Sequence, residues 1–211
     1  MNAFAKSIVA LLLLPCMARA EECPRPSPDP GRELFTRFDT PEFRAALRRG
    51  HSWRDSAGLI GEYSSRLELA AFLDDVELVK ELAPFAPYDV RVSAASFAIA
   101  EGHKDLVVLF LDERWISPDS SRANAPLILT ASATGHAEVL REFIDRKADM
   151  YVKDGEVLFQ AIIQHQQQAV ATLLAAGFDA SRFRTPKGQT AVELARKLKD
   201  PCIEKLLSAA P

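Results

Sequence analysis

An alanine recurs along this chain, and apolar residues keep fixed offsets from it. Successive alanines lie 28, 33, 30 and 34 residues apart, at Ala70, Ala98, Ala131, Ala161 and Ala195. Apolar residues stand three before each alanine, then eight and twelve after it: Leu67, Leu78 and Leu82; Ala95, Leu106 and Phe110; Ile128, Val139 and Phe143; Leu158, Ala169 and Leu173; Val192, Ile203 and Leu207. A period of this length is typical of stacked repeats. Because stacked repeats present extended surfaces, the pattern favours a binding function.

Each repeat is expected to form two antiparallel helices separated by a short break. Gly102-His103 is the break in the second repeat, and the residues from Leu106 to Leu111 follow with apolar positions at helical spacing. Gly135-His136 is the break in the third repeat, and His165-Gln166 takes its place in the fourth. The recurring alanine has a physical reason, since a small side chain lets helices pack at about 8–10 Å.

These residues resemble the ankyrin repeat, whose pattern begins G-x-T-P-L-H-x-A-A, continues with G-H and an apolar helix, and ends in G-A-D. The resemblance is closest in Gly102–Leu111, Gly135–Ile144, Leu173–Asp179 and Gly188–Ala195, and it covers roughly Ser64 to Leu207. The T-P-L-H tetrapeptide is intact in none of them. The resemblance implies an all-α ankyrin-repeat solenoid of about five degenerate helix-turn-helix repeats.

The residues before the repeats divide into three segments. Residues 1–20 have the features of a secretory signal peptide: Lys6 near the start, an apolar run from Ile8 to Leu14, and Ala18-Arg19-Ala20 as a cleavage site. We expect cleavage after Ala20. A Pro-rich arm (21–39) follows, and then a capping helix with its linker (40–63). Thr40-Pro41-Glu42 is a typical helix start and Gly50 its expected end. The repeat array occupies 64–211.

The charge balance and the cysteine content limit the classes of function that fit this chain. Lys6 and Arg19 are the only charged residues within 1–20, so the remaining chain carries 24 basic and 29 acidic side chains. This balance does not favour nucleic-acid binding, which leaves a basic footprint. No second apolar stretch predicts membrane insertion after cleavage. Cys23 and Cys202 suggest one disulfide in an oxidising compartment. Alternatively, the ends of a stacked array lie far apart and both thiols stay reduced.

The sequence predicts no catalytic residue, metal site or cofactor. His103, His136 and His165 occupy the same slot between helices in successive repeats, which stack about 10 Å apart. Ligands of one metal ion must converge more closely, so hydrogen bonding at helix ends is the expected role of these histidines. The Ser, His and Asp residues within 51–56 are not accompanied by a Gly-x-Ser-x-Gly motif.

The connections between repeats each place an aromatic residue near a charge. In ankyrin proteins such connections form finger-like hairpins, which make a concave binding surface together with the first helices. Tyr, Trp and Arg are also the residue types that dominate interface hot spots. Alternatively, the aromatic side chains pack beneath the hairpins. The predicted partner-binding residues are Tyr88, Arg91, Trp115, Arg122, Tyr151, Lys153, Phe183 and Arg184.

The resemblance and the signal peptide together imply a non-enzymatic protein-binding module of the bacterial periplasm, monomeric when free. One concrete role is an immunity protein that occludes the active site of an antibacterial toxin, such as a secreted lipase effector. The alternative is an accessory scaffold in peroxide resistance, resembling periplasmic ankyrin proteins that accompany a catalase. A toxin gene or a catalase gene beside this one would discriminate between the two roles.

Overall fold

The computed structural model describes residues 40–49 and 65–209, which fall into two compact units. The first unit ends at Arg122 and the second begins at Ala123. Both are helical, apart from the short strands β1 (Ser121–Arg122) and β2 (Ala125–Pro126). The predicted all-α class is therefore confirmed for the described residues. The signal peptide, the Pro-rich arm and residues 50–64 lie outside them.

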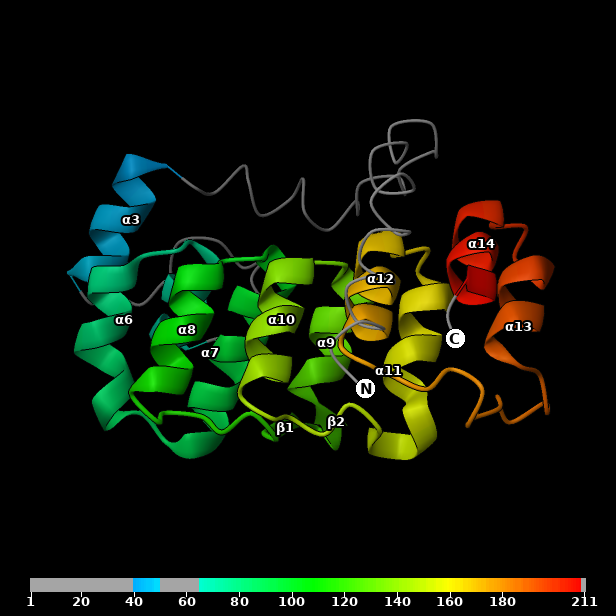
Figure 1. The fold of residues 1–211 in the computed structure, drawn as a ribbon. Coiled ribbons are helices and arrows are strands. Elements are labelled where there is room, and N and C mark those ends of the chain that lie inside the picture. Colours follow the sequence, from blue (N-terminus) through cyan, green and yellow to red (C-terminus); the bar gives the residue numbers. More distant parts are fainter. Residues whose placement is uncertain (1–39, 50–64, 210–211) are drawn as a thin grey trace. The chain divides into compact units, whose positions relative to one another are not determined.

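The first unit consists of one leading helix and two helix pairs. Its elements are α3 (Pro41–Arg48), α5 (Arg66–Phe72), α6 (Val76–Leu82), the 3₁₀ helix η2 (Ala83–Phe85), α7 (Tyr88–Glu101) and α8 (Lys104–Asp112). Helix α5 packs on α6 and α7 packs on α8, while α5 and α7 also pack on each other. Figure 1 shows α7 beside α8.

Helix α3 has a side-chain cap at its start and a buried contact with the start of α5. Thr40 accepts a hydrogen bond from Phe43 N at 3.1 Å, which satisfies one of the unpaired amides of the first turn. Leu47 is only 2% exposed, and its carbonyl accepts from Arg66 Nε at 3.0 Å, so α3 is joined to the start of α5. A helix is therefore present at the predicted position, while its capping role stays a prediction and Gly50, its predicted end, lies outside the described residues.

The second unit consists of three helix pairs. Its helices are α9 (Leu127–Thr134), α10 (Ala137–Asp145), α11 (Val152–Ile163), α12 (Gln167–Ala175), α13 (Ala191–Lys197) and α14 (Pro201–Ala209). The first helices of the pairs pack in the order α9, α11, α13, and the second helices in the order α10, α12, α14. The unit thus has two helical layers (Figure 1).

The recurring alanine lies at the centre of the packing in both units. All five alanines are 0% exposed, and all their predicted apolar neighbours are buried except Leu82 and Val192, which are half-buried. Helices approach one another over a side chain of one carbon, and the larger residues eight and twelve positions later fill the remaining space. The predicted core is confirmed at these positions.

The turn inside each helix pair has a fixed register to the alanine. The fourth residue after it has a left-handed backbone with φ between 56° and 78°: Asp74, Gly102, Gly135, His165 and Lys199. The next residue directly precedes the first residue of the second helix: Asp75, His103, His136, Gln166 and Asp200. The prediction that three histidines share one slot is therefore wrong for His165, which lies one position early in the turn.

Two of these histidines make the hydrogen bonds at helix ends that the sequence predicted. His103 Nε2 lies 2.9 Å from the carbonyl oxygen of Phe72, in the preceding helix pair. His165 Nδ1 lies 2.8 Å from Asp200 Oδ2, in the following pair. Asp200 is the N-cap of α14, because its other oxygen accepts from Ile203 N at 3.0 Å. Polar residues of the turns thus connect neighbouring pairs.

Candidate partner-binding groove

A groove of about 570 Å³ opens in the second unit between α11, α13 and the connection that precedes α13. Its α11 wall carries Phe159 and Ile163, which are four residues apart and therefore share one face of the helix. Leu194 of α13 and Pro186 of the connection complete the apolar lining. Ile163 is 44% exposed, which is unusual among the large apolar residues of the described chain. The groove thus offers apolar surface to solvent.

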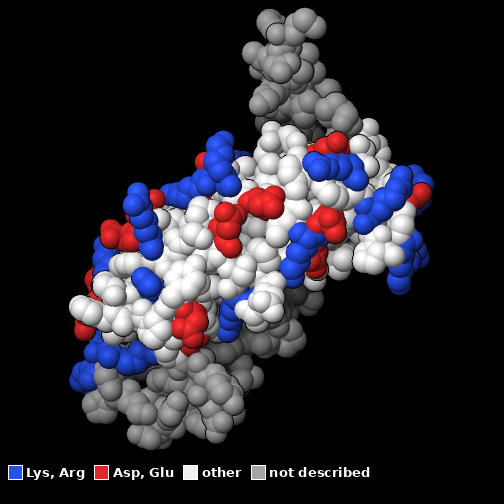
Figure 2. Space-filling model, turned by 90° about the horizontal axis from the view of Figure 1, so that it is seen from below, with Lys and Arg blue, Asp and Glu red and all other residues white. Residues whose placement is uncertain are grey.

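Charged side chains surround this apolar lining, and basic ones outnumber acidic ones. The basic residues are Lys153, Arg184, Lys187 and Lys197, and the acidic residues are Asp154 and Glu156. Figure 2 shows both signs of charge interspersed over the face that it presents. Such a rim steers and selects acidic partners more than it adds raw affinity.

The start of α13 is fixed by a capping box beside the groove. Thr190 N donates to Glu193 Oε2 at 2.8 Å, and Glu193 N donates to Thr190 Oγ1 at 3.1 Å. These bonds from Thr190 lower the pKa of the exposed Glu193, and the charge of Arg184 adds to the effect. Helix α13 therefore begins at a defined residue, which positions Leu194 and Lys197 in the groove.

An unusual backbone segment forms the rim at the start of α11. Lys153, Asp154 and Gly155 all have left-handed conformations, with φ of 49°, 56° and 78°. This region costs an ordinary L-residue about 1–2 kcal/mol, and such strain clusters at binding sites. A Cβ on Gly155 would lie 2.8 Å from Phe183 Cδ2, so only glycine fits there. The segment is held by the aromatic residues that pack against it.

Those aromatic residues form a cluster beneath the rim. The ring of Tyr151 stacks on Phe178 at a centroid distance of 4.9 Å and lies 5.7 Å from Phe183. The guanidinium of Arg182 covers the outer side, 5.3 Å from the centroid of Tyr151 and 5.2 Å from that of Phe183. Tyr151 and Phe183 therefore support the loops by packing, which is the alternative that the sequence left open for them.

Trp115 also packs in the interior. It is 8% exposed and lies edge-on to Phe110, with ring centroids 5.6 Å apart and planes at 81°. A side chain so buried offers almost no area to a partner, so the predicted contact role of Trp115 is corrected to a core role. The aromatic–charge pattern did not distinguish Trp115 from exposed aromatic residues. The burial of Trp115 depends on its contact with Phe110 in the neighbouring helix, which the pattern does not include.

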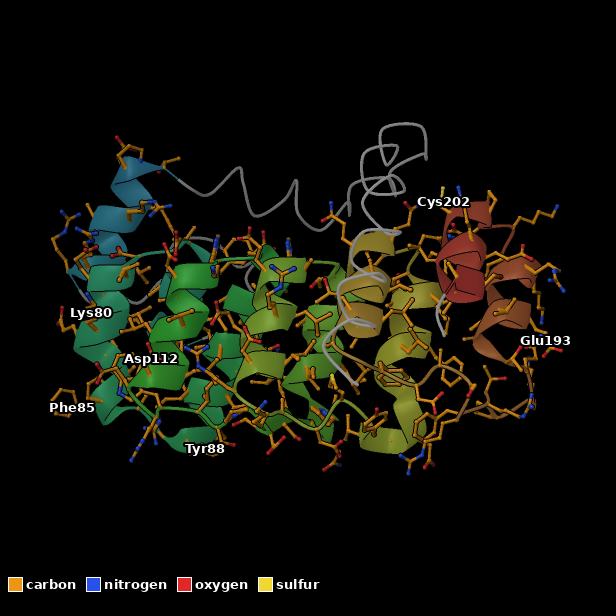
Figure 3. All side chains as sticks on the ribbon, viewed as in Figure 1. Lys80, Phe85, Tyr88, Asp112, Glu193 and Cys202 are labelled. Atoms are coloured by element: carbon orange, nitrogen blue, oxygen red, sulfur yellow. The ribbon has the colours of Figure 1, made fainter. Side chains whose placement is uncertain are left out.

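The remaining predicted contacts lie in the first unit. Tyr88 is 51% exposed, and its hydroxyl lies 2.7 Å from Ser120 Oγ. The guanidinium carbon of Arg91 lies 5.7 Å from the ring centroid of Tyr88, and that of Arg122 lies 4.9 Å from the ring of Phe97. Phe85, which the sequence did not single out, is 88% exposed, and it projects with Tyr88 from the end of the unit where η2 joins α7 (Figure 3).

The groove therefore unites two predicted contacts, Lys153 and Arg184, with residues that the sequence analysis missed. The most informative of the missed residues are Phe159, Ile163 and Lys197. A signal for two of them exists, because Phe159 and Ile163 are apolar positions of α11 outside the recurring alanine pattern. Their meeting with Lys197 depends on the packing of α11 against α13, which the sequence does not display.

The described residues also bear on disulfide, metal and membrane predictions. Cys202 on α14 is disulfide-bonded, but Cys23 lies outside the described chain, so the Cys23–Cys202 pairing stays a prediction. Within the described ranges no cluster of three or more His, Cys, Asp and Glu side chains has a geometry that would hold a metal ion. Nor does any helix in these ranges have the length and apolar character needed to span a membrane.

The groove is a candidate site because a cavity, charged side chains and left-handed backbone residues coincide there. Protein-family models and curated proteins were both compared with this chain, and neither comparison gives a match.

Proposed function

We propose that this chain is an exported, ankyrin-type binding protein that holds a segment of another protein in the groove of its second unit, and that it is not an enzyme. The observation that carries the proposal is the exposed Ile163, which lies beside the buried Phe159 and Leu194 in a groove with a charged rim. Apolar surface framed by polar groups is the usual composition of binding clefts and of interface cores.

The regularity of the helix pairs supports the ankyrin-type assignment. The left-handed turn residue recurs four positions after every alanine, and first helices contact first helices in both units. Repeats of this kind bury their apolar faces on their neighbours and leave one side for ligands. The walls of the groove come from the first helices α11 and α13 and from the connection between repeats. These are the elements that form the ligand-binding side in the proposed type of repeat.

The exposed part of Ile163 sets the free energy that a partner can gain by covering it. It is already partly covered, at 44% exposed, and the remaining apolar area is what a partner would remove from water. Full burial of a side chain of this size is worth about 1.5–3 kcal/mol, so covering the exposed part contributes a fraction of that.

Within this function we propose the role of an immunity protein, which binds a toxin of the same compartment and covers its active site. The test begins with proteins encoded beside the gene, each purified and titrated against this chain by calorimetry. Ile163→Asp places a carboxylate in the groove and is expected to weaken binding at least tenfold. Gln164→Asp adds the same charge one residue away, outside the groove lining, and is expected to bind as the wild type does.

The role is tested by co-expression. A neighbouring toxin directed to the periplasm should stop growth alone, and the wild-type chain should restore growth while Ile163→Asp should not. Equal partner affinities for the wild type and Ile163→Asp would remove the groove from the proposed function. Tight binding without protection would leave a binding protein that is not an immunity protein.

A further inference from the structure

We infer that the groove accepts an extended peptide segment in which a large apolar side chain is flanked by carboxylates. This inference rests on the proposed function and specifies the chemistry of the partner. It follows from the arrangement of charge around the apolar lining: Lys153 comes from the start of α11, Arg184 and Lys187 from the connection, and Lys197 from α13. Basic groups thus stand on all three elements that form the groove.

The size of the groove selects a segment over a folded surface. Its volume of about 570 Å³ lies within the range of about 300–1,000 Å³ that is usual for clefts holding small ligands. Such a space admits a short stretch of chain with its side chains, whereas a flat protein surface cannot fill it. Ile163, at the end of α11, is a large apolar residue of the lining and is 44% exposed, so we place the partner's apolar side chain there.

The two acidic residues orient the segment. Asp154 and Glu156 both belong to the first part of α11, while Arg184, Lys187 and Lys197 belong to the connection and α13. A partner with carboxylates on the α13 side avoids like-charge contacts with Asp154 and Glu156. Because the rim is exposed, its attraction is screened by salt, and binding should weaken as ionic strength rises.

Three fluorescein-labelled ten-residue peptides test this chemistry with the full mature chain. The first has a Leu-Phe centre flanked by Glu and Asp, the second replaces every acid with Lys, and the third keeps the acids but replaces Leu-Phe with Ser-Ser. Fluorescence anisotropy should give binding of the first peptide at least tenfold tighter than of the other two. Raising NaCl from 50 to 300 mM should weaken that binding severalfold.

Matched charge reversals locate the binding. Lys197→Glu should weaken binding of the acidic Leu-Phe peptide at least fivefold, whereas Lys205→Glu on α14, an exposed position outside the groove, should leave it unchanged. Circular dichroism melting curves check that both variants fold. Equal effects of the two reversals, or tighter binding of the basic peptide, would overturn the inference.

Two further outcomes separate this inference from the proposed function. A single-stranded oligonucleotide that displaces the acidic peptide as well as unlabelled peptide does would mean that the rim recognises polyanions in general, which overturns the inference. If none of the peptides binds while a natural partner still distinguishes Ile163→Asp from Gln164→Asp, the assigned partner chemistry is wrong and the proposed function stands.

Discussion

Asp75 binds Arg48 through two parallel hydrogen bonds, with Arg48 Nε and Nη2 each 2.8 Å from a carboxylate oxygen. The same carboxylate accepts from Leu78 N at 3.2 Å and so caps α6. The Asp75 side chain is completely buried, whereas that of Arg48 is 55% exposed. One acidic side chain thus joins the capping helix α3 to the first helix pair. The bonds from Arg48 hold the pKa of Asp75 below its ordinary value of 3.8.

Asp75→Asn should lower stability in a pH-dependent way. Because the folded pKa of Asp75 is below the unfolded one, its carboxylate stabilises the fold above pH 4, and this contribution is lost as the pH falls through the folded pKa. Asparagine can still cap α6, so the loss at pH 7 should be about 1 kcal/mol, from the pair with the half-exposed Arg48.

Urea denaturation at pH 7, 5 and 3 measures this difference. The gap between the wild type and Asp75→Asn should shrink toward pH 3. Glu81→Gln, which neutralises an exposed carboxylate on the same helix, serves as the control. A gap that stays constant over this range would mean that the ionisation of Asp75 does not stabilise the fold.

Gly155→Ala and Gly177→Ala form a matched pair for the aromatic cluster. Both glycines have positive φ, 78° and 88°, but a Cβ at Gly155 would meet Phe183 at 2.8 Å, whereas at Gly177 nothing lies within 4 Å. Gly177→Ala should cost about 1–2 kcal/mol, from the backbone alone. Gly155→Ala should cost about 1–3 kcal/mol more, because the rings must move. Thermal unfolding followed by circular dichroism measures the loss of stability in each variant. Equal losses for Gly155→Ala and Gly177→Ala would contradict the packing of Phe183 against Gly155.

Ala161→Leu tests the recurring alanine. The site is 0% exposed where α11 packs on α9, so the added carbons should destabilise the second unit by about 1–3 kcal/mol. Ala175→Leu makes the same change at an exposed position of α12 and should shift stability by less than about 0.5 kcal/mol. Guanidinium denaturation of both variants provides the measurement, and a neutral Ala161→Leu would contradict tight helix contact there.

The sequence predicted the helix pairs and their core well because a repeat imposes the same local packing several times. The positions of Ala98 and Ala161 predict close helix contacts, and Thr40 before Pro41 predicts a helix start. Both predictions depend only on residues close together in the sequence. The same spacing also corrects the position of His165. His103 and His136 lie five residues after the recurring alanine, but the fifth residue after Ala161 is Gln166 and not His165.

The binding residues were harder to predict because they depend on contacts between distant segments. Trp115 and Tyr88 stand in similar aromatic–charge patterns, yet Trp115 is buried against Phe110 while Tyr88 is half-exposed. Ile163 and Lys197 join one groove only because α11 packs on α13. Local sequence patterns identify side chains that are able to bind a partner. The packing of neighbouring repeats determines which of these side chains are exposed next to one another.

Lys153→Gly should stabilise the fold and weaken binding at the same time. Lys153 has φ of 49°, which glycine adopts without strain, so the substitution should raise the free energy of unfolding by up to about 1 kcal/mol. It also removes a basic group from the groove rim, so affinity for the acidic Leu-Phe peptide should fall severalfold.

The control for this pair of effects is Lys80→Gly. Lys80 is exposed on α6, in the first unit, and it has an ordinary helical backbone (Figure 3). Glycine there should destabilise by about 1 kcal/mol and leave peptide affinity unchanged. Denaturation and anisotropy on the same preparations separate the two effects. If Lys153→Gly destabilises as much as Lys80→Gly, the left-handed rim is not strained; if it stabilises without loss of affinity, Lys153 does not contact the peptide.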